Sequence, residues 1–254
     1  MTAMADQPAM ARPVAGTQAA AGGHAAESVL AIVPARGGSK RLPGKNLRPL
    51  GGLSLLGWTA RCAAAAGMPA PLLTTDDAEI AAEAKRHGYA VPFLRPRELA
   101  ADDTPTVPAV LHALDRHREA AGRDPALVVL LQVTSPFRAP DLIREGIARL
   151  AGTPGADALV AMKELHVALG HVYRDERGFA APVAPKSAER AYVPSGALYV
   201  IRTSALRREE TFMPPRCLCL PHSGLSCLDI DTPEDWALAE AAVAAGLVRP
   251  AEAA

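Results

Sequence analysis

Short apolar runs alternate with amphipathic segments along residues 29–162, and each kind of segment predicts a different element. The apolar runs are expected to form strands over residues 29–33, 72–75, 90–94, 127–133 and 158–162. The amphipathic segments are expected to form helices over residues 53–66, 76–88, 107–121 and 140–150. Regular alternation of strand and helix is typical of βαβ units. The pattern therefore predicts an open, mostly parallel twisted sheet with helices on both faces, a Rossmann-like α/β fold.

The pattern changes after residue 162. Residues 163–193 are more polar and weakly periodic, so they are expected to form a small lobe inserted into one α/β domain, residues 29–162 and 194–246. Further strands are expected over residues 197–201, 217–220 and 228–230, and a last helix over residues 233–245. The run 127–133 is apolar nearly throughout, which is typical of a central strand buried on both faces.

Composition narrows the class of protein. The 254 residues carry 27 basic and 27 acidic side chains, so a nucleic-acid partner is not expected. No apolar run reaches the roughly 18 residues of a membrane span, which favours a cytoplasmic protein without a membrane partner. Residues 1–28 are rich in alanine and glycine without periodicity, which predicts a disordered tail. The four cysteines lack the paired CxxC spacing of a zinc site.

Candidate chemistry begins in the loop after the first strand, PARGGSKRLPGKN, residues 34–46. Glycines let backbone N–H groups approach phosphate oxygens, and cations neutralise those oxygens. The side chains expected to bind a triphosphate are Arg36, Ser39, Lys40 and Lys45. Asn46 carries both a donor and an acceptor, so it is expected to read a base edge. The glycine spacing fits neither a Walker A loop nor a GxGxxG motif, and a solvated basic turn is the alternative.

A second candidate is the sequence LDIDTPED, residues 228–235. Asp229 and Asp231 are two residues apart, so on an extended strand they point to the same side. Such a pair of carboxylates favours a divalent cation such as Mg²⁺. The alternative is that Asp231 or Thr232 caps the helix that follows. Because a phosphate-binding loop is expected nearby, we interpret the pair as a metal site.

Three other loops are expected at the same edge of the sheet. The sequence LLQVTSPFR delivers a set of polar side chains from a buried strand into the ligand crevice, namely Gln132, Thr134, Ser135 and Arg138. Arg95 and Thr104 belong to a polar loop that either contacts a nucleotide or is simply solvated. Asp76 follows a strand and is expected to cap a helix, with a supporting contact to metal or nucleotide as the alternative.

Six motifs, taken together and in order, resemble the CMP-sialic acid synthetases, which activate N-acylneuraminate and related nonulosonic acids. The motifs are PARGGSKRLPGKN, TTDD, LRPxELAxDDTP, LLQxTSPxR, SGALYV and LDIDTPED, between residues 29 and 245. The resemblance implies a nucleotidyltransferase α/β fold that joins CMP from CTP to a sugar acid, releases pyrophosphate and uses Mg²⁺. It also implies a homodimer in which the lobe at residues 163–193 reaches into the neighbouring active site.

The resemblance also implies roles for individual residues. Carried over by position, the CTP-binding residues are Arg36, Ser39, Lys40, Lys45, Asn46, Arg95, Pro105 and Thr106. The sugar site is lined by Gln132 and Tyr199, and the nearest candidates to pair with the sugar carboxylate are Lys186 and Arg190. The metal is held by Asp229 and Asp231, and catalysis is carried by Arg36, Lys45 and Asp231.

Two departures from the family pattern fall on the sugar side. Members commonly have proline where this chain has Val133, and asparagine where it has Ser195. The identity of the acid therefore stays open. The alternatives are CTP-dependent activation of Kdo or another sugar acid, and a nucleotide-binding relative without catalysis.

Overall fold

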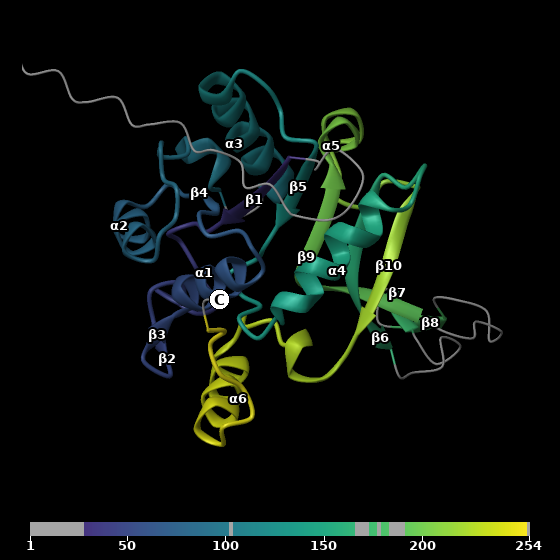
Figure 1. Cartoon of the computed structure of the whole chain (residues 1–254). Coiled ribbons are helices and arrows are strands. Elements are labelled where there is room, and N and C mark those ends of the chain that lie inside the picture. The colour runs from purple at the N-terminus through teal and green to yellow at the C-terminus, as the bar shows by residue number, and fades with distance from the viewer. Residues whose placement is uncertain (1–27, 102–103, 166–172, 177–178, 183–190, 253–254) are drawn as a thin grey trace, which may run out of the picture.

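The computed structural model describes residues 28–101, 104–165, 173–176, 179–182 and 191–252. Its main feature is a six-stranded sheet in the order β10-β6-β9-β5-β1-β4 (Figure 1). The strands are β1 (Val29–Pro34), β4 (Leu72–Thr74), β5 (Leu127–Leu130), β6 (Ala158–Leu165), β9 (Ala191–Arg202) and β10 (Cys217–His222). Strand β9 runs antiparallel to β5 and β6, whereas the other neighbours pair in parallel. The mostly parallel sheet expected from the sequence is confirmed.

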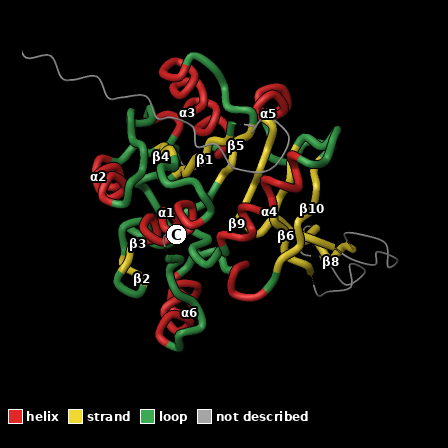
Figure 2. The backbone as a smooth tube through the Cα atoms, in the orientation of Figure 1, coloured by secondary structure: helices red, strands yellow, loops and turns green. Residues whose placement is uncertain are grey.

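Helices cover both faces of the sheet (Figure 2). They are α1 (Leu55–Ala65), α2 (Ala78–Arg86), α3 (Thr106–Ala121), α4 (Pro140–Ala151), α5 (Thr203–Glu209) and α6 (Pro233–Ala244). Two short 3₁₀ helices, η1 (Arg97–Leu99) and η3 (Gly224–Cys227), lie in loops. The helices expected from the sequence are present, with boundaries shifted by a few residues.

The two faces of the sheet bury two hydrophobic clusters, and the alternation of side chains along the strands separates them. In β1, Ala31 and Val33 join the larger cluster, whereas Leu30 and Ile32 join the smaller one. Strand β5 divides its side chains in the same way. A strand that is apolar on both faces needs helices on both, because each exposed face would leave apolar surface in water.

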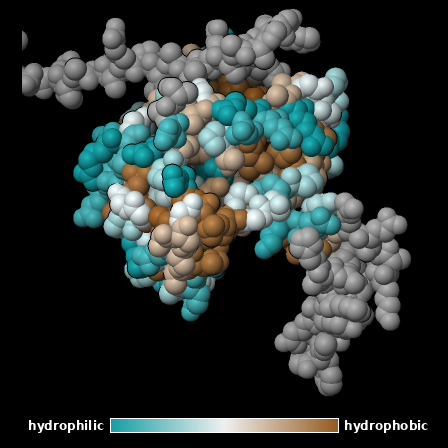
Figure 3. All heavy atoms as spheres, turned by 60° about the horizontal axis from the view of Figure 1, so that its bottom comes forward, coloured by the Kyte–Doolittle hydropathy of each residue, from teal (hydrophilic) through white to brown (hydrophobic). Residues whose placement is uncertain are grey.

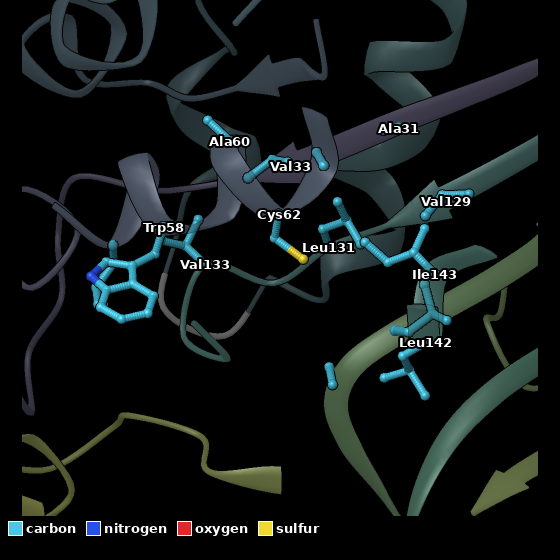
Figure 4. Packing of buried hydrophobic residues seen from close by; sticks show 14 of the residues in the cluster. Ala31, Val33, Trp58, Ala60, Cys62, Val129, Leu131, Val133, Leu142 and Ile143 are labelled. Atoms are coloured by element: carbon cyan, nitrogen blue, oxygen red, sulfur yellow. The ribbon is translucent and has the colours of Figure 1, made fainter. Parts of the chain in front are cut away.

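The larger cluster lies under α1 and α4 (Figure 4). Trp58 of α1 packs edge-on against Phe137, with ring centroids 5.3 Å apart, and donates its indole N–H to the Leu50 carbonyl at 2.9 Å. Helix α4 contributes Leu142 and Ile143 to the same cluster. These contacts fix the loop between β5 and α4, and this loop forms part of the candidate site.

The surface is mixed in character. Figure 3 looks onto the face that carries α6 and shows apolar side chains gathered beside hydrophilic ones. Among the described residues, the large hydrophobic side chains left exposed include Leu238 of α6 and Leu247 just after it. None of the described helices combines the length and apolar character needed to cross a lipid bilayer.

Two of the expected strands, both in ranges that the structure describes, do not form. Residues 90–94 make one isolated parallel bridge, between Leu72 and Ala90. Pro92 lacks the N–H that a ladder requires, and Leu94 points its side chain toward solvent. Residues 228–230 are extended but not paired in a sheet, since the Ile230 N–H donates to the Thr134 carbonyl in a loop, at 2.8 Å.

The start of the first expected helix forms a small hairpin instead. Strands β2 (Pro49–Leu50) and β3 (Leu53–Ser54) pair antiparallel around Gly51 and Gly52. Both glycines have positive φ, 60° and 82°, as the two-residue turns of tight hairpins require. Helix α1 begins only after this turn, with Ser54 as its N-cap.

The region expected to form a lobe is continuous with the sheet at both ends. Strands β6 and β9 extend into it and remain paired as far as Leu165 and Ala191. Between them, β7 (Tyr173–Glu176) and β8 (Phe179–Pro182) form an antiparallel pair. The candidate residues Lys186 and Arg190 lie outside the described residues, as does the expected tail except Ser28, whose carbonyl accepts from the N–H of Leu127 at 3.1 Å.

The N-cap of α2 corrects one prediction. Asp77, not Asp76, caps this helix, and its carboxylate accepts from the N–H groups of Glu79 and Ile80 at 2.8 and 3.0 Å. Asp76 points instead toward Gly37 and Arg95. Both of these adjacent aspartates are of a residue type that caps helices, and the position at which the helix begins decides which of them is the N-cap.

We expect Asp77→Ala to lower the free energy of unfolding by about 1 kcal/mol, because two N–H groups of α2 lose their acceptor. Asp77→Asn, which keeps a capping oxygen, should be nearly neutral. Urea denaturation of both variants and the wild type measures the difference. Equal stability of Asp77→Ala and the wild type would contradict the assignment of the cap.

Candidate active site

A cavity of about 330 Å³ opens beyond the carboxyl ends of β1 and β5, where ligands bind on sheets of this kind. Four loops form it: the loop after β1, the segment around η1, the turn after β5 and the segment before α6. Thirteen of the residues singled out from the sequence line the cavity: Arg36, Ser39, Lys40, Lys45, Asn46, Arg95, Thr104, Pro105, Thr106, Gln132, Thr134, Asp229 and Asp231. Loops that are far apart in sequence thus meet as the pattern predicted.

The loop after β1 is braced by its own polar groups. Asn46, which is 6% exposed, donates its side-chain N–H to the Arg36 carbonyl at 3.0 Å and so ties the two ends of the loop together. Gly44 adopts a φ of +68°, and its carbonyl accepts from the N–H groups of Leu47 and Arg48. Asn46 therefore has a structural bond in addition to the base contact expected of it.

Asp231 joins the last loop to the first. Its carboxylate contacts Lys45 Nζ and Arg41 Nη2, both at 2.6 Å, and Lys45 Nζ also donates to the Ile230 carbonyl at 3.1 Å. The side chain of Lys45 is only 12% exposed, so this ion pair is shielded more than a surface pair. Arg41 was not among the site residues chosen from the sequence, although it is one of the four cations of the loop.

Asp229 lies half-buried beside Asp231 and faces the same cavity. Burial raises the pKa of its carboxyl group, and the nearby negative charge of Asp231 adds to the shift, while a hydrogen bond with Thr134 opposes it. Its Oδ1 atom is buried without a hydrogen-bond partner among the described residues. An unsatisfied buried oxygen of this kind is costly unless a ligand or ion satisfies it.

These two carboxylates fit a divalent cation that shares its coordination with a ligand. Mg²⁺ prefers carboxylate and phosphate oxygens and usually keeps several waters, so one or two protein ligands suffice. Within the described residues, no group of three or more His, Cys, Asp or Glu side chains is placed to hold a metal. A cation here would therefore depend on ligand oxygens for the rest of its shell.

A second network links the loop after β1 to the segment around η1. The Asp76 carboxylate accepts from the Gly37 N–H at 3.2 Å and lies 3.4 Å from Arg95 Nη2. Burial lowers the pKa of Arg95, which is only 6% exposed, and Asp76 opposes this shift. Arg36 Nη1 donates to the Ala101 carbonyl at 3.1 Å and closes the rim of the cavity.

The N-terminus of α3 also faces the cavity. Pro105 precedes the helix and Thr106 begins it, and both line the cavity. Free N–H groups at a helix N-terminus attract anions and acceptor atoms. This gives the expected Pro105–Thr106 backbone contact a physical basis.

Two residues expected on the sugar side, Arg138 and Tyr199, do not line this cavity, and contact of Tyr199 with a sugar acid stays a prediction. Arg138 is buried behind the turn after β5, where its guanidinium donates to the Gln132 carbonyl and does not line the cavity. Burial lowers its pKa. The ring of Tyr199 packs against Phe212, with centroids 5.6 Å apart, on the face of the smaller cluster. The sequence pattern could not distinguish an arginine that supports the turn from one that lines the crevice.

We expect Asp229→Asn to raise the melting temperature of the ligand-free protein. The raised pKa of Asp229 means that folding disfavours its charged form, so stability is lost as the pH rises through that pKa and a neutral amide avoids the loss. A gain of about 1 kcal/mol would appear as roughly 2–4 °C in a chain of this size.

Thermal melts of Asp229→Asn over a range of pH provide the measurement, and Asp235→Asn is the matched control. Burial alone would raise the pKa of Asp235, but hydrogen bonds from the Asp231 and Thr232 backbone and the Thr232 hydroxyl lower it, so this variant should lose stability at neutral pH. The gain in Asp229→Asn should shrink as the pH falls. A loss of stability in Asp229→Asn at neutral pH would refute the prediction.

Comparison with known proteins agrees with this geometry. Residues 30–204 match the family described as cytidylyltransferase. A CMP-N,N'-diacetyllegionaminic acid synthase of Legionella pneumophila subsp. pneumophila is 32% identical over 221 residues, which cover 84% of this chain and 94% of that protein. An N-acylneuraminate cytidylyltransferase of Streptococcus agalactiae serotype V is 29% identical over 219 residues, covering 82% of this chain and 51% of that protein.

Two proteins that act on eight-carbon sugar acids, by their names, extend the comparison. A 3-deoxy-manno-octulosonate cytidylyltransferase of Nitrobacter hamburgensis is 32% identical over 200 residues, covering 70% of this chain and 72% of that protein. Among solved structures, a CMP:2-keto-3-deoxy-manno-octonic acid synthetase complexed with CTP superposes with a TM-score of 0.64 at 18% identity, covering 86% of this chain and 99% of that one. At this identity the superposition supports the fold alone.

Proposed function

Because the chain belongs to the cytidylyltransferase family, we propose that it joins CMP from CTP to a nonulosonic, sialic-acid-like sugar acid and releases pyrophosphate. The observation that carries the proposal is that the cations of the loop after β1 and the carboxylates Asp229 and Asp231 line one cavity. Nucleotidyl transfer requires this combination, because the triphosphate must be neutralised and held while its α-phosphorus is attacked.

Different residues of the chain bind the triphosphate and the cytidine end of the nucleotide. Arg36, Lys40 and Lys45, with the Ser39 hydroxyl, bind the triphosphate, and Arg95 and the start of α3 hold the cytidine end. The anomeric hydroxyl of the acid attacks the α-phosphorus in line and gives up its proton to solvent, and the bond to pyrophosphate breaks. Negative charge grows on the departing oxygens, where Arg36 and Lys45 stabilise it.

Mg²⁺ is part of the proposal. Asp229 and Asp231 would hold it, and the orphaned Oδ1 atom of Asp229 supports this assignment. When bound, the ion supplies positive charge next to the phosphate oxygens. Lys45 and Arg41 neutralise Asp231 in the protein without ligand, and both line the cavity proposed to hold the triphosphate.

We infer the class of acid from the sequence similarity to two relatives. The legionaminic acid relative aligns along 94% of its length, against 72% for the octulosonate relative at the same identity. This favours a nonulosonic acid over Kdo. Kdo activation is the second candidate, since the octulosonate relative is 32% identical to this chain over 200 residues.

We expect pyrophosphate release when the protein is given CTP, Mg²⁺ and one acid from a panel of N-acetylneuraminic, diacetyllegionaminic, pseudaminic and Kdo acids. Turnover should require CTP and should fall to background in EDTA, returning with added Mg²⁺. Release with Kdo alone would replace the favoured substrate class by the second candidate. Tight CTP binding without release from any acid would contradict the enzymatic proposal.

We also propose a cytoplasmic homodimer in which the partner's lobe, with Lys186 and Arg190, completes the site for the acid.

Asp231→Asn should fold and lose nearly all turnover, and the double variant Lys186→Ala/Arg190→Ala should lose binding of the acid. Refolding the two together should restore about a quarter of wild-type turnover, because half of the dimers would hold one intact site. No recovery, with dimers present by light scattering, would refute a shared site.

A further inference from the structure

Strand β9 carries an irregularity that faces the candidate site. Its pairing with β6 slips by three residues between Val160, which opposes Tyr199, and Met162, which opposes Pro194. The extra residues include Gly196, whose φ is +80°. Bulges of this kind re-aim a strand and are common beside active sites.

The bulge presents bare backbone to two residues of the cavity. A Cβ atom at Gly196 would lie 2.7 Å from Gln132 Oε1 and 3.6 Å from Asp229 Cγ, and 3.0 Å from Ser135 Oγ. Neither the positive φ nor this spacing tolerates a side chain. The position of Gly196 therefore sets how closely the chain approaches Gln132 and Asp229.

The hydroxyl of Ser195 holds the bulge in place. Ser195 is 7% exposed, and its Oγ donates to the Ala161 carbonyl of β6 at 3.0 Å. The same oxygen accepts from the Ala197 N–H at 3.3 Å. One hydroxyl thus ties the two sides of Gly196 to each other and to the neighbouring strand.

A histidine from β10 completes this arrangement. His222 Nε2 lies 2.6 Å from Ser195 Oγ, and Nδ1 lies 2.9 Å from Ser226 Oγ. Because the Ser195 hydroxyl gives its proton to Ala161, it accepts from His222, so Nε2 carries the hydrogen. Burial lowers the pKa of His222, which favours a neutral ring with its hydrogen on Nε2. In that ring Nδ1 accepts from the Ser226 hydroxyl, which then donates to Nδ1 in place of the Ser223 carbonyl. His222 neither lines the nucleotide cavity nor touches the residues assigned to CTP.

We propose that His222 is a positioning residue for the sugar acid: it fixes the Ser195 hydroxyl and through it the Gly196 bulge against Gln132 and Asp229. This inference rests on the proposed function. It distinguishes the two substrates, because the groups proposed to contact CTP directly come from the loop after β1, the segment around η1 and the start of α3, whereas Asp229 would act on CTP only through the ion. Loss of the His222 bond should therefore weaken use of the acid and leave use of CTP unchanged.

Steady-state kinetics with each substrate varied in turn tests the inference. We expect His222→Leu to raise KM for the acid, or to lower kcat, by about three- to tenfold, with KM for CTP changed by less than about twofold. His222→Gln places an amide N–H near the position of Nε2 and should recover most of the loss. Ser195→Ala should reproduce His222→Leu, and the double variant should be no worse than either.

The matched control is His87→Leu. His87 is also half-buried and lies 3.3 Å from a serine hydroxyl, that of Ser54, but it faces Glu83 on α2 and not the cavity. This variant should lower the melting temperature and leave both KM values unchanged. If His222→Leu raises the two KM values equally, or changes neither KM value nor kcat, or if His222→Gln is as impaired as His222→Leu, the inference is wrong. A wild-type protein that uses no acid would instead overturn the proposed function, and the inference with it.

Discussion

The pairing of Asp231 with Lys45 and Arg41 is the constraint on which the site depends. It joins groups that are 186 and 190 residues apart in the chain and brings the first loop of the sheet against the last. Four cations within one short loop repel one another, and a carboxylate set among them reduces that repulsion. The triphosphate of the proposed substrate carries charge of the same sign as Asp231. In the proposed reaction, binding would exchange one anionic partner of the cations for another, and the loop would already be shaped when the nucleotide arrives.

The same edge of the sheet carries groups that oppose stability. Asp229 is kept half-buried with an unsatisfied oxygen, and Arg95 has a buried Nε without a partner among the described residues. Each would be more stable in water or replaced by a neutral side chain. The large core beneath them, built from both faces of β1 and β5, compensates for this cost. Proteins commonly retain such unfavourable groups where a ligand will satisfy them.

The elements that could be predicted from sequence are those whose signal is local. Recognising the strand–helix alternation and the basic, glycine-containing loop after β1 needed only side-chain periodicity and residue type. The failures depend on contacts distant in sequence. Arg138 belongs to a motif of polar residues, but its neighbours Cys62 and Tyr89 come from a helix and a loop far upstream. Residues 228–230 have the composition of a strand and lack a strand to pair with. The role of Asn46 in bracing its loop depends on a backbone carbonyl, which no residue pattern records.

The place of β9 in the sheet has a consequence for how the chain acquires its structure. Among the described strands, β9 is the only link between β5 and β6, so β4-β1-β5 and β6-β10 form two pieces that share no ladder without it. During synthesis the first 165 residues contain one of these pieces and the beginning of the other, each with an open edge. Closure waits until residues 191–202 emerge and insert between them, against both neighbours in the antiparallel sense. The nascent chain is therefore exposed to mispairing and to capture by chaperones over a long interval. The segment that ends this interval also contains Gly196 and its bulge.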